Sequence, residues 1–230
     1  MSATATNIPV GSLRFWETTV GKKAIMAITG VILFGFVVGH LLGNLQIFLP
    51  PERINRYAAT LRSHPGLVWT ARIILLVSVI LHIWSSFQLW LLQRGARPVN
   101  YVKKTNINST YASRTMMWSG PIILAFVIFH LLHLTLGTVH PGGPFDVDNV
   151  YQNVVTGFQV WPVSLFYIIA MIMLCYHLYH GLWSMFQSLG FSHPVYTPWL
   201  KLFAKIVAIL IAIGNISIPV AVLSGFIKPV

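Results

Sequence analysis

The sequence predicts an all-α, polytopic membrane protein with five transmembrane helices in one bundle and the N-terminus in the cytoplasm. The chain of 230 residues is 56% hydrophobic and only 8% charged, whereas soluble domains carry about 25% charged residues. Five stretches remain mostly apolar for about 20 residues or more, the length that a helix needs to cross a bilayer. The basic residues lie between these stretches and concentrate in alternate loops.

The five spans form a single transmembrane domain, residues 1–230, with no visible repeat. The segment before the first span lacks the apolar region and cleavage site of a signal peptide. Turn signals separate the spans: LPPER closes the first, SHPG opens the second and HPGGPFD follows the third. The predicted spans cover about residues 24–49, 67–93, 117–139, 161–189 and 203–226.

The loop charges predict the orientation. The formal net charge is +11, but the basic residues are interleaved with apolar runs, which favours a membrane protein over a nucleic-acid-binding one. The positive-inside rule places the N-terminus in the cytoplasm and the C-terminus outside. The basic residues on the predicted inner side are Arg14, Lys22, Lys23, Arg94, Arg97, Lys103, Lys104, Arg114, Lys201 and Lys205.

Six of the nine histidines lie inside the predicted spans. Histidines in hydrocarbon are costly unless they are paired, and ionisable groups there are usually functional. A hydrogen bond to a neighbouring helix could explain one such residue, but histidines in four of five spans need another explanation. His64, His140 and His193 lie next to prolines and are interpreted as ordinary loop residues. The six are His40, His82, His130, His133, His177 and His180.

The depths of these histidines in the membrane group four of them into two pairs. His40 and His130 each lie nine residues before the outer ends of their spans, while His82 and His177 lie eleven and twelve residues before the inner ends. With a rise of about 1.5 Å per residue these depths match within a few ångströms. Two histidine pairs at two depths, each from two helices, are typical of two haems with bis-histidine ligation.

The second histidine of each doublet leaves an ambiguity. His133 and His180 lie about 4.5 Å further along nearly the same helix face. Depth favours His130 for the outer pair, whereas His177 and His180 are almost equally good for the inner pair. Zinc is a weaker interpretation, because zinc sites gather three or four ligands at one level. The four acids, Glu17, Glu52, Asp146 and Asp148, all lie outside the apolar cores.

Seven further stretches are informative when taken together: VGKKAIMAITG, GHLLGNLQIF, INRYAATLR, LHIWSSFQLW, ARPVNYVKK, YASRTMMWSG and HLYHGLWSMFQSLG. They resemble a known family, the cytochrome b membrane-anchor subunit of succinate:quinone oxidoreductases (succinate dehydrogenases and fumarate reductases). The resemblance is to the single-chain, five-helix, two-haem type and extends over about residues 20–225. It implies axial ligation of the outer haem by His40 and His130, and of the inner haem by His82 and His177.

The resemblance also implies cofactors and partners. These are two b-type haems, a diffusible quinone such as menaquinone, and a flavoprotein (FAD) subunit and an iron–sulfur subunit on the cytoplasmic face of a bacterial-type inner (plasma) membrane. The chain would be the quinone-reactive subunit, with succinate handled by the flavoprotein. Some two-haem relatives carry a carboxylate in the fourth helix, whereas MLCY precedes His177 here, which puts their proton-compensated mechanism in doubt.

Basic and polar residues near the predicted haems are further candidates. Arg72, Lys22, Lys23 and Arg114 are candidates for binding haem propionates, which need cationic or hydrogen-bonding partners. For quinone the outer side is favoured, through Asn44 and Glu52, because an outer haem needs an electron acceptor on its own side. The inner alternative uses Ser12, Arg14, Lys22 and His180.

Two alternative functions stay open at this stage. A dihaem cytochrome b of a hydrogenase or formate dehydrogenase would also place histidine pairs between helices. A haem-free anchor or a small transporter would use the histidines as polar residues along a path.

Overall fold

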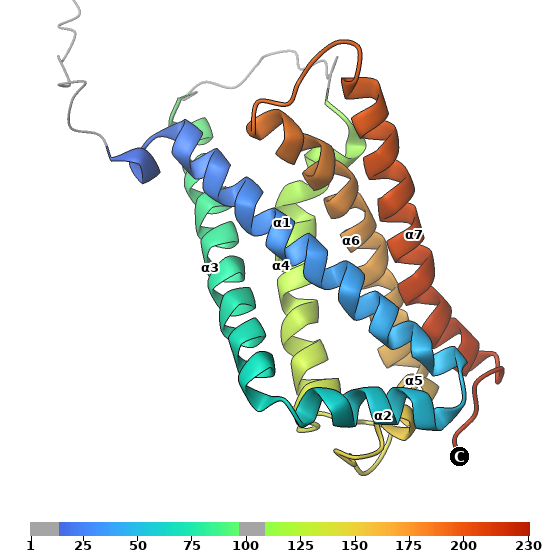
Figure 1. Ribbon diagram of the computed structural model, residues 1–230. Coiled ribbons are helices and arrows are strands. Elements are labelled where there is room, and N and C mark those ends of the chain that lie inside the picture. The colour runs from blue at the N-terminus through green and yellow to red at the C-terminus, as the bar shows by residue number, and fades with distance from the viewer. Residues whose placement is uncertain (1–13, 97–108) are drawn as a thin grey trace, which may run out of the picture.

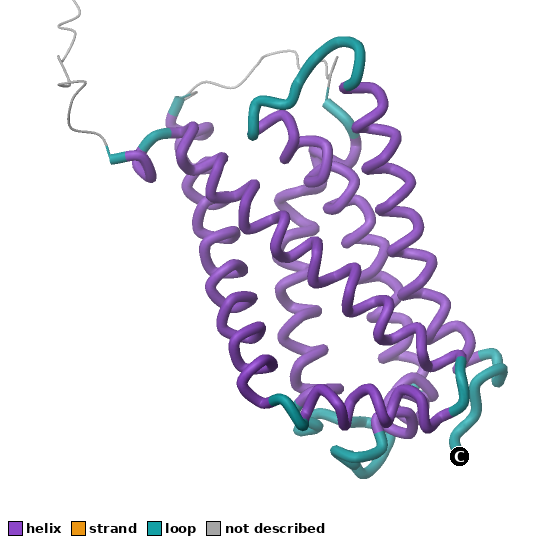
Figure 2. The backbone as a smooth tube through the Cα atoms, viewed as in Figure 1, coloured by secondary structure: helices purple, strands orange, loops and turns teal. Residues whose placement is uncertain are grey.

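The computed structural model describes residues 14–96 and 109–230. In this part of the chain the secondary structure is helical, without strands, and five helices are long and apolar enough to cross a membrane (Figures 1 and 2). The predicted all-α fold with five membrane-spanning helices is therefore confirmed. The five long helices are α1 (Thr19–Asn44), α3 (Pro65–Gly95), α4 (Tyr111–His130), α6 (Trp161–Ser188) and α7 (Thr197–Leu223).

Three of the long helices begin five or six residues before the predicted starts of their spans. Hydropathy marks where a helix enters hydrocarbon, whereas the helix itself begins at its N-cap. The side chain of Thr18 accepts a hydrogen bond from the Gly21 N–H, and that of Thr110 accepts one from the Ser113 N–H. These caps start α1 and α4 in their polar first turns.

Two segments between the predicted spans, where no helix was predicted, are helical: α2 (Pro51–Arg62) and α5 (Val150–Gln159). Both helices are too short to span a membrane, and only one face of each is apolar, so a search for apolar stretches passes over them. Ile54 of α2 and Val155 of α5 are buried against the bundle. Both helices lie at one end of the bundle, which we call the capped end (Figure 1).

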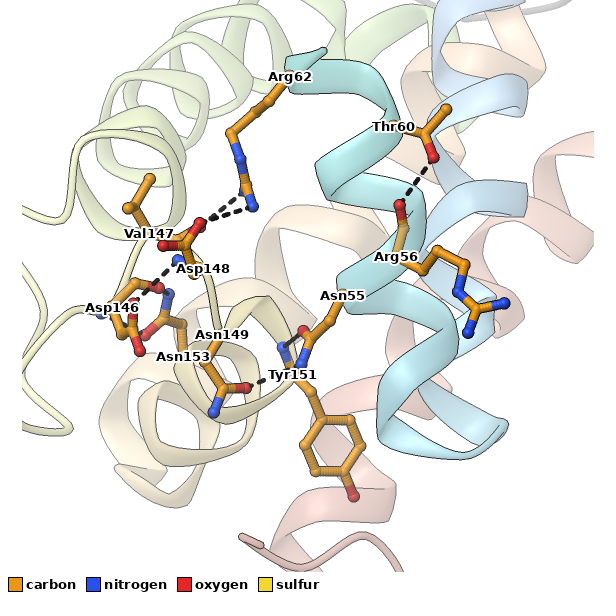
Figure 3. Close-up of polar contacts among 10 residues, drawn as sticks. All are labelled: Asn55, Arg56, Thr60, Arg62, Asp146, Val147, Asp148, Asn149, Tyr151 and Asn153. Atoms are coloured by element: carbon orange, nitrogen blue, oxygen red, sulfur yellow. Dashed lines mark hydrogen bonds and ion pairs between the residues drawn. The ribbon is translucent and has the colours of Figure 1, made fainter.

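Polar contacts hold the two short helices together across the capped end (Figure 3). Arg62 forms an ion pair with Asp148 at 3.0 Å and donates a second hydrogen bond to the Val147 carbonyl at 2.7 Å. Asn55 accepts from the Tyr151 N–H at 2.9 Å. The segment between α4 and α5 is thereby fixed to α2 at the capped end.

The long helices do not all pack against one another. α6 packs against α7 and α4, and α1 packs mainly against α3. Fully buried Ala204 and Ala208 let α7 approach α6 closely. Neither α1 with α4 nor α3 with α6 forms an extensive helix–helix contact. The side chains that face each other between these helices therefore define the interior of the bundle.

Candidate functional site

The first histidine pair lies near the capped end. The ring centroids of His40 and His130 are 5.7 Å apart and the ring planes meet at 87°. His40 is in the last turn of α1, and His130 is the last residue of α4. Each ring stacks on a phenylalanine one turn earlier, His40 on Phe36 and His130 on Phe126. The structure thus brings together the two residues of the predicted outer pair.

The second pair lies further from the capped end, near the middle of α3 and α6. The ring centroids of His82 and His177 are 6.2 Å apart, and the planes meet at 53°. The structure therefore contains two histidine pairs at two levels of one bundle, as the depth argument predicted. In each doublet, the first histidine is the one whose ring meets a histidine across the bundle.

Hydrogen bonds hold one ring nitrogen in three of these four histidines. His82 Nδ1 lies 3.2 Å from the Met26 carbonyl and 3.3 Å from Thr29 Oγ1. The Thr29 hydroxyl already donates to the Ile25 carbonyl at 2.8 Å, so the His82 Nδ1–H is the donor in both contacts. The neutral ring then carries its lone pair on Nε2, the nitrogen that is free to bind a metal.

Two of the other three pair members, His177 and His130, also have an Nδ1 contact with a hydroxyl. His177 Nδ1 lies 3.3 Å from Ser119 Oγ, and His130 Nδ1 lies 3.2 Å from the Tyr167 hydroxyl. Ser119 is fully buried and Tyr167 is nearly so. Metal-ligating histidines usually donate their second N–H to such a partner, which fixes the tautomer and the ring orientation. Sequence reasoning missed Thr29, Ser119 and Tyr167, whose only signal is a hydroxyl within an apolar span.

The spacing of the paired rings fits one metal atom between them. A metal–imidazole bond is about 2 Å long, and the ring centre lies about 1 Å beyond the nitrogen, so two in-line ligands have ring centroids about 6 Å apart. The observed separations are 5.7 and 6.2 Å. Gly181 follows His177 by one turn, and a Cβ there would meet no atom within 4 Å. A flat macrocycle beside His177 can use that room.

A cluster of metal ligands of the zinc type is not present in the described residues. There, no three side chains of His, Cys, Asp or Glu come together. The histidines instead meet in twos, which suits an ion that takes its remaining ligands from a macrocycle.

Comparison with known proteins gives the family. A family model described as "Succinate dehydrogenase/Fumarate reductase transmembrane subunit" matches residues 93–216, more than half of the chain. The chain belongs to this family. The predicted membership in the succinate dehydrogenase and fumarate reductase anchor family is confirmed, and the alternatives of a hydrogenase cytochrome b or a transporter are set aside. No curated protein and no solved structure matches the chain.

In this transmembrane subunit the second histidine of each doublet has surroundings of its own. His133 is fully buried, and its Nδ1 lies 3.0 Å from the same Tyr167 hydroxyl. His140, interpreted from the sequence as an ordinary loop residue, packs against His133 with ring centroids 5.1 Å apart. His180 meets Trp183 edge to face, and within the described residues its Nδ1 and the Trp183 Nε1 are buried without hydrogen-bond partners.

The basic candidates on α1 differ in burial. Lys22 is only 8% exposed, whereas Lys23 is exposed. Lys22 precedes Thr29 by seven residues, so both lie on one face of α1, about 10 Å apart along its axis. Thr29 contacts His82, and Lys22 is therefore on the interior face, displaced from His82 toward the end opposite the capped end.

The two arginine candidates are exposed and stack on aromatic rings of their own helices. The Arg72 guanidinium lies 5.1 Å from the ring centroid of Trp69, and both residues line a cavity of about 260 Å³ with Arg62. The Arg114 guanidinium lies 5.9 Å from the ring centroid of Tyr111.

The quinone candidates lie at opposite ends of the bundle. Asn44 ends α1, one turn after His40, and is half-buried, while Glu52 is exposed in the first turn of α2. At the other end the exposed Arg14 lies over Trp16. Ser12 lies outside the described residues.

Proposed function

We propose that this transmembrane subunit is the dihaem cytochrome b anchor of a succinate:quinone oxidoreductase, connecting an iron–sulfur subunit with membrane quinone. One observation carries the proposal. Two histidine pairs face each other at the ring spacing of a shared metal, and three of the four histidines have Nδ1 held by a hydrogen bond, which leaves Nε2 free.

His40 and His130 would hold one b-type haem near the capped end, and His82 and His177 would hold the other. When bound, the haems supply one-electron transfer between the iron–sulfur subunit and quinone. The protein residues hold the ligand rings in place: α1 and α4 carry one pair, α3 and α6 the other, and the hydroxyls of Thr29, Ser119 and Tyr167 keep the tautomer that exposes Nε2.

Lys22 is the best-supported partner for a haem propionate. A cation that is almost fully buried at the end of a membrane helix needs an anionic or hydrogen-bonding partner, and Lys22 shares its helix face with the residue that contacts His82. Arg72 is a candidate for the other haem, because it lies toward the capped end of α3. The exposed positions of Lys23 and Arg114 equally suit lipid phosphates.

The charge distribution supports a cytoplasmic location of the end opposite the capped end. That end carries the basic residues of the starts of α1, α4 and α7 and of the end of α3. An iron–sulfur subunit and its flavoprotein would bind there, on the side of the His82–His177 pair. Quinone such as menaquinone would then react at the capped end of this bacterial-type plasma-membrane protein, near Asn44 and Glu52.

Haem analysis of the purified subunit tests the proposal. We expect two b-type haems per chain and, after reduction, the sharp α and β bands of low-spin bis-histidine haem. A purified, folded chain without haem bands would show a haem-free anchor and overturn the proposal.

Enzyme assays of the assembled complex test the quinone site. Separate replacements Asn44→Ala and Glu52→Gln should lower quinone-linked turnover while leaving succinate oxidation by an artificial dye unchanged. Arg14→Ala, at the other end, is the matched control. Loss of the quinone-linked activity in Arg14→Ala alone would place the quinone at the cytoplasmic end.

A further inference from the structure

One hydroxyl group joins two histidines of the same doublet. The Tyr167 oxygen lies 3.2 Å from His130 Nδ1 and 3.0 Å from His133 Nδ1. Tyr167 belongs to α6, whereas the histidines lie at the end of α4 and in the turn that follows. This network is separate from the contacts of the other proposed ligands, because His82 and His177 have their own partners.

The protons of this network can be placed by counting them. A His130 ring that binds iron through Nε2 carries its only proton on Nδ1, so it donates to the Tyr167 oxygen. In the described residues the Tyr167 hydroxyl has no partner besides the two histidines, so its single proton finds an acceptor only if it points to His133 Nδ1, and we assign it there. His133 accepts this hydrogen bond and carries its own proton on Nε2, which is buried and has no hydrogen-bond partner in the described residues. All three groups therefore point their donors in one direction, away from the iron.

The local backbone positions His133 for this role. Residues Leu131–Thr135 form a π-helical turn, in which the Leu136 N–H donates to the Leu131 carbonyl at 2.9 Å. π-Turns inside α-helices frequently occur at functional sites. The wider turn changes the direction of His133 relative to a continuous α-helix, and the ring comes to rest fully buried.

Close packing fixes the network from the other side. A Cβ added to Gly157 of α5 would lie 2.5 Å from His133 Nε2, so the ring can occupy its place only beside a glycine. The Tyr167 ring meets Phe158 and Phe126 edge to face, with centroids 4.8 and 5.0 Å apart. The hydrogen bonds are therefore preformed, and neither side chain needs to reorganise to make them.

We propose that Tyr167 and His133 are positioning residues for His130: together they fix its ring plane and strengthen it as an electron donor to iron. This inference rests on the proposed function. A hydrogen bond from the far N–H of a ligating histidine raises the basicity of the ligand, and second-sphere hydrogen bonding is one of the levers that set a haem potential. The haem held by His40 and His130 thus has a lower reduction potential than it would have without the hydroxyl.

Redox titration of the purified subunit with Tyr167→Phe tests this inference. The variant keeps the aromatic packing and removes only the hydroxyl. We expect both haems to remain bound and the one-electron reduction equilibrium of the His40–His130 haem to shift about tenfold toward the reduced form, or about 59 mV. The other haem should keep its potential. The two signals are assigned with His177→Ala, which should lack the His82–His177 haem.

Tyr151→Phe is the matched control. Tyr151 is also buried at the capped end, and its hydroxyl donates one hydrogen bond, to the Lys228 carbonyl at 3.0 Å. It belongs to a different network, so its removal should leave both potentials unchanged. An equal shift in both tyrosine variants, or no shift in Tyr167→Phe with both haems bound, would overturn the inference while leaving the proposed function standing.

If Tyr167→Phe loses the haem, two variants of His133 test the inference instead. His133→Asn keeps an acceptor close to the Nδ1 position, whereas His133→Leu removes it. We expect a raised potential of the His40–His130 haem in His133→Leu and an unshifted potential in His133→Asn. Where Tyr167→Phe keeps both haems, combining it with His133→Leu should give no additional shift, because coupled residues are not additive. Equal potentials in the two His133 variants would overturn the inference. Absence of haem from the unaltered chain would instead overturn the proposed function.

Discussion

The ring of His40 stands almost perpendicular to the ring of His130, at 87°, with the two centroids 5.7 Å apart. The corresponding angle between His82 and His177 is 53°. Perpendicular axial imidazoles leave two iron d orbitals nearly equal in energy, and this makes the g-values of a low-spin ferric haem strongly anisotropic. The two haems should therefore differ in their electron paramagnetic resonance spectra.

The first prediction is that the oxidised subunit shows two low-spin ferric signals, with the more anisotropic one from the His40–His130 haem. Spectra of His177→Ala, in which only that haem remains, assign the signals. If the remaining signal is the less anisotropic of the two, the ring orientation described here does not hold in the haem-bound subunit.

A second prediction compares the hydroxyl partners of the ligands His177 and His82. Ser119 is the one partner of His177 Nδ1 in the described structure, whereas His82 Nδ1 keeps the Met26 carbonyl when Thr29 is altered. Loss of such a partner typically lowers metal affinity about 10- to 100-fold. Ser119→Ala should therefore lose haem more readily than Thr29→Val during dilution into an apo-protein acceptor. Equal haem loss rates would contradict this account.

A third prediction concerns stability at Gly157. In a helix interior, alanine is usually about 1 kcal/mol more stable than glycine, but a Cβ at this position would overlap the buried His133 ring. Gly157→Ala should therefore be destabilising, by about 1–3 kcal/mol as for other overpacked sites. Gly66→Ala is the control, since a Cβ there meets no atom within 4 Å. Thermal unfolding in detergent should give a lower Tm for Gly157→Ala only.

A fourth prediction compares two neighbouring lysines. Lys22 is buried on the interior face and Lys23 is exposed. A positive charge near a haem favours the reduced state, because reduction adds an electron. Lys22→Met should lower the potential of the His82–His177 haem, and Lys23→Met should leave it unchanged. Redox titration gives the answer, and equal potentials in both variants would contradict the placement of Lys22 beside a propionate.

Much of the fold follows from hydropathy, and much of the site follows from the depth of each histidine in its span. Continuous apolar runs required five spans, and equal distances from the span ends grouped His40 with His130 and His82 with His177. The structure places the rings of these pairs side by side. These features depend on one-dimensional spacing, which a single sequence displays directly.

The remaining features depend on contacts between distant parts of the chain. α2 and α5 are stabilised by the burial of Ile54 and Val155 at the capped end, and neither helix contains an apolar run that would predict it. Tyr167 reaches His133 from 34 residues away, through a π-turn that leaves no pattern in the sequence. The contact of His140 with His133 was missed for the same reason.

The haem content of single histidine variants tests the central claim most directly. Chemical haem determination on the purified subunit should give two haems for the unaltered chain, and one each for His40→Ala, His130→Ala, His82→Ala and His177→Ala. His180→Ala should keep two, because its ring does not face His82 across the bundle. Two haems retained by His177→Ala, or one lost from His180→Ala, would contradict the ligand assignment.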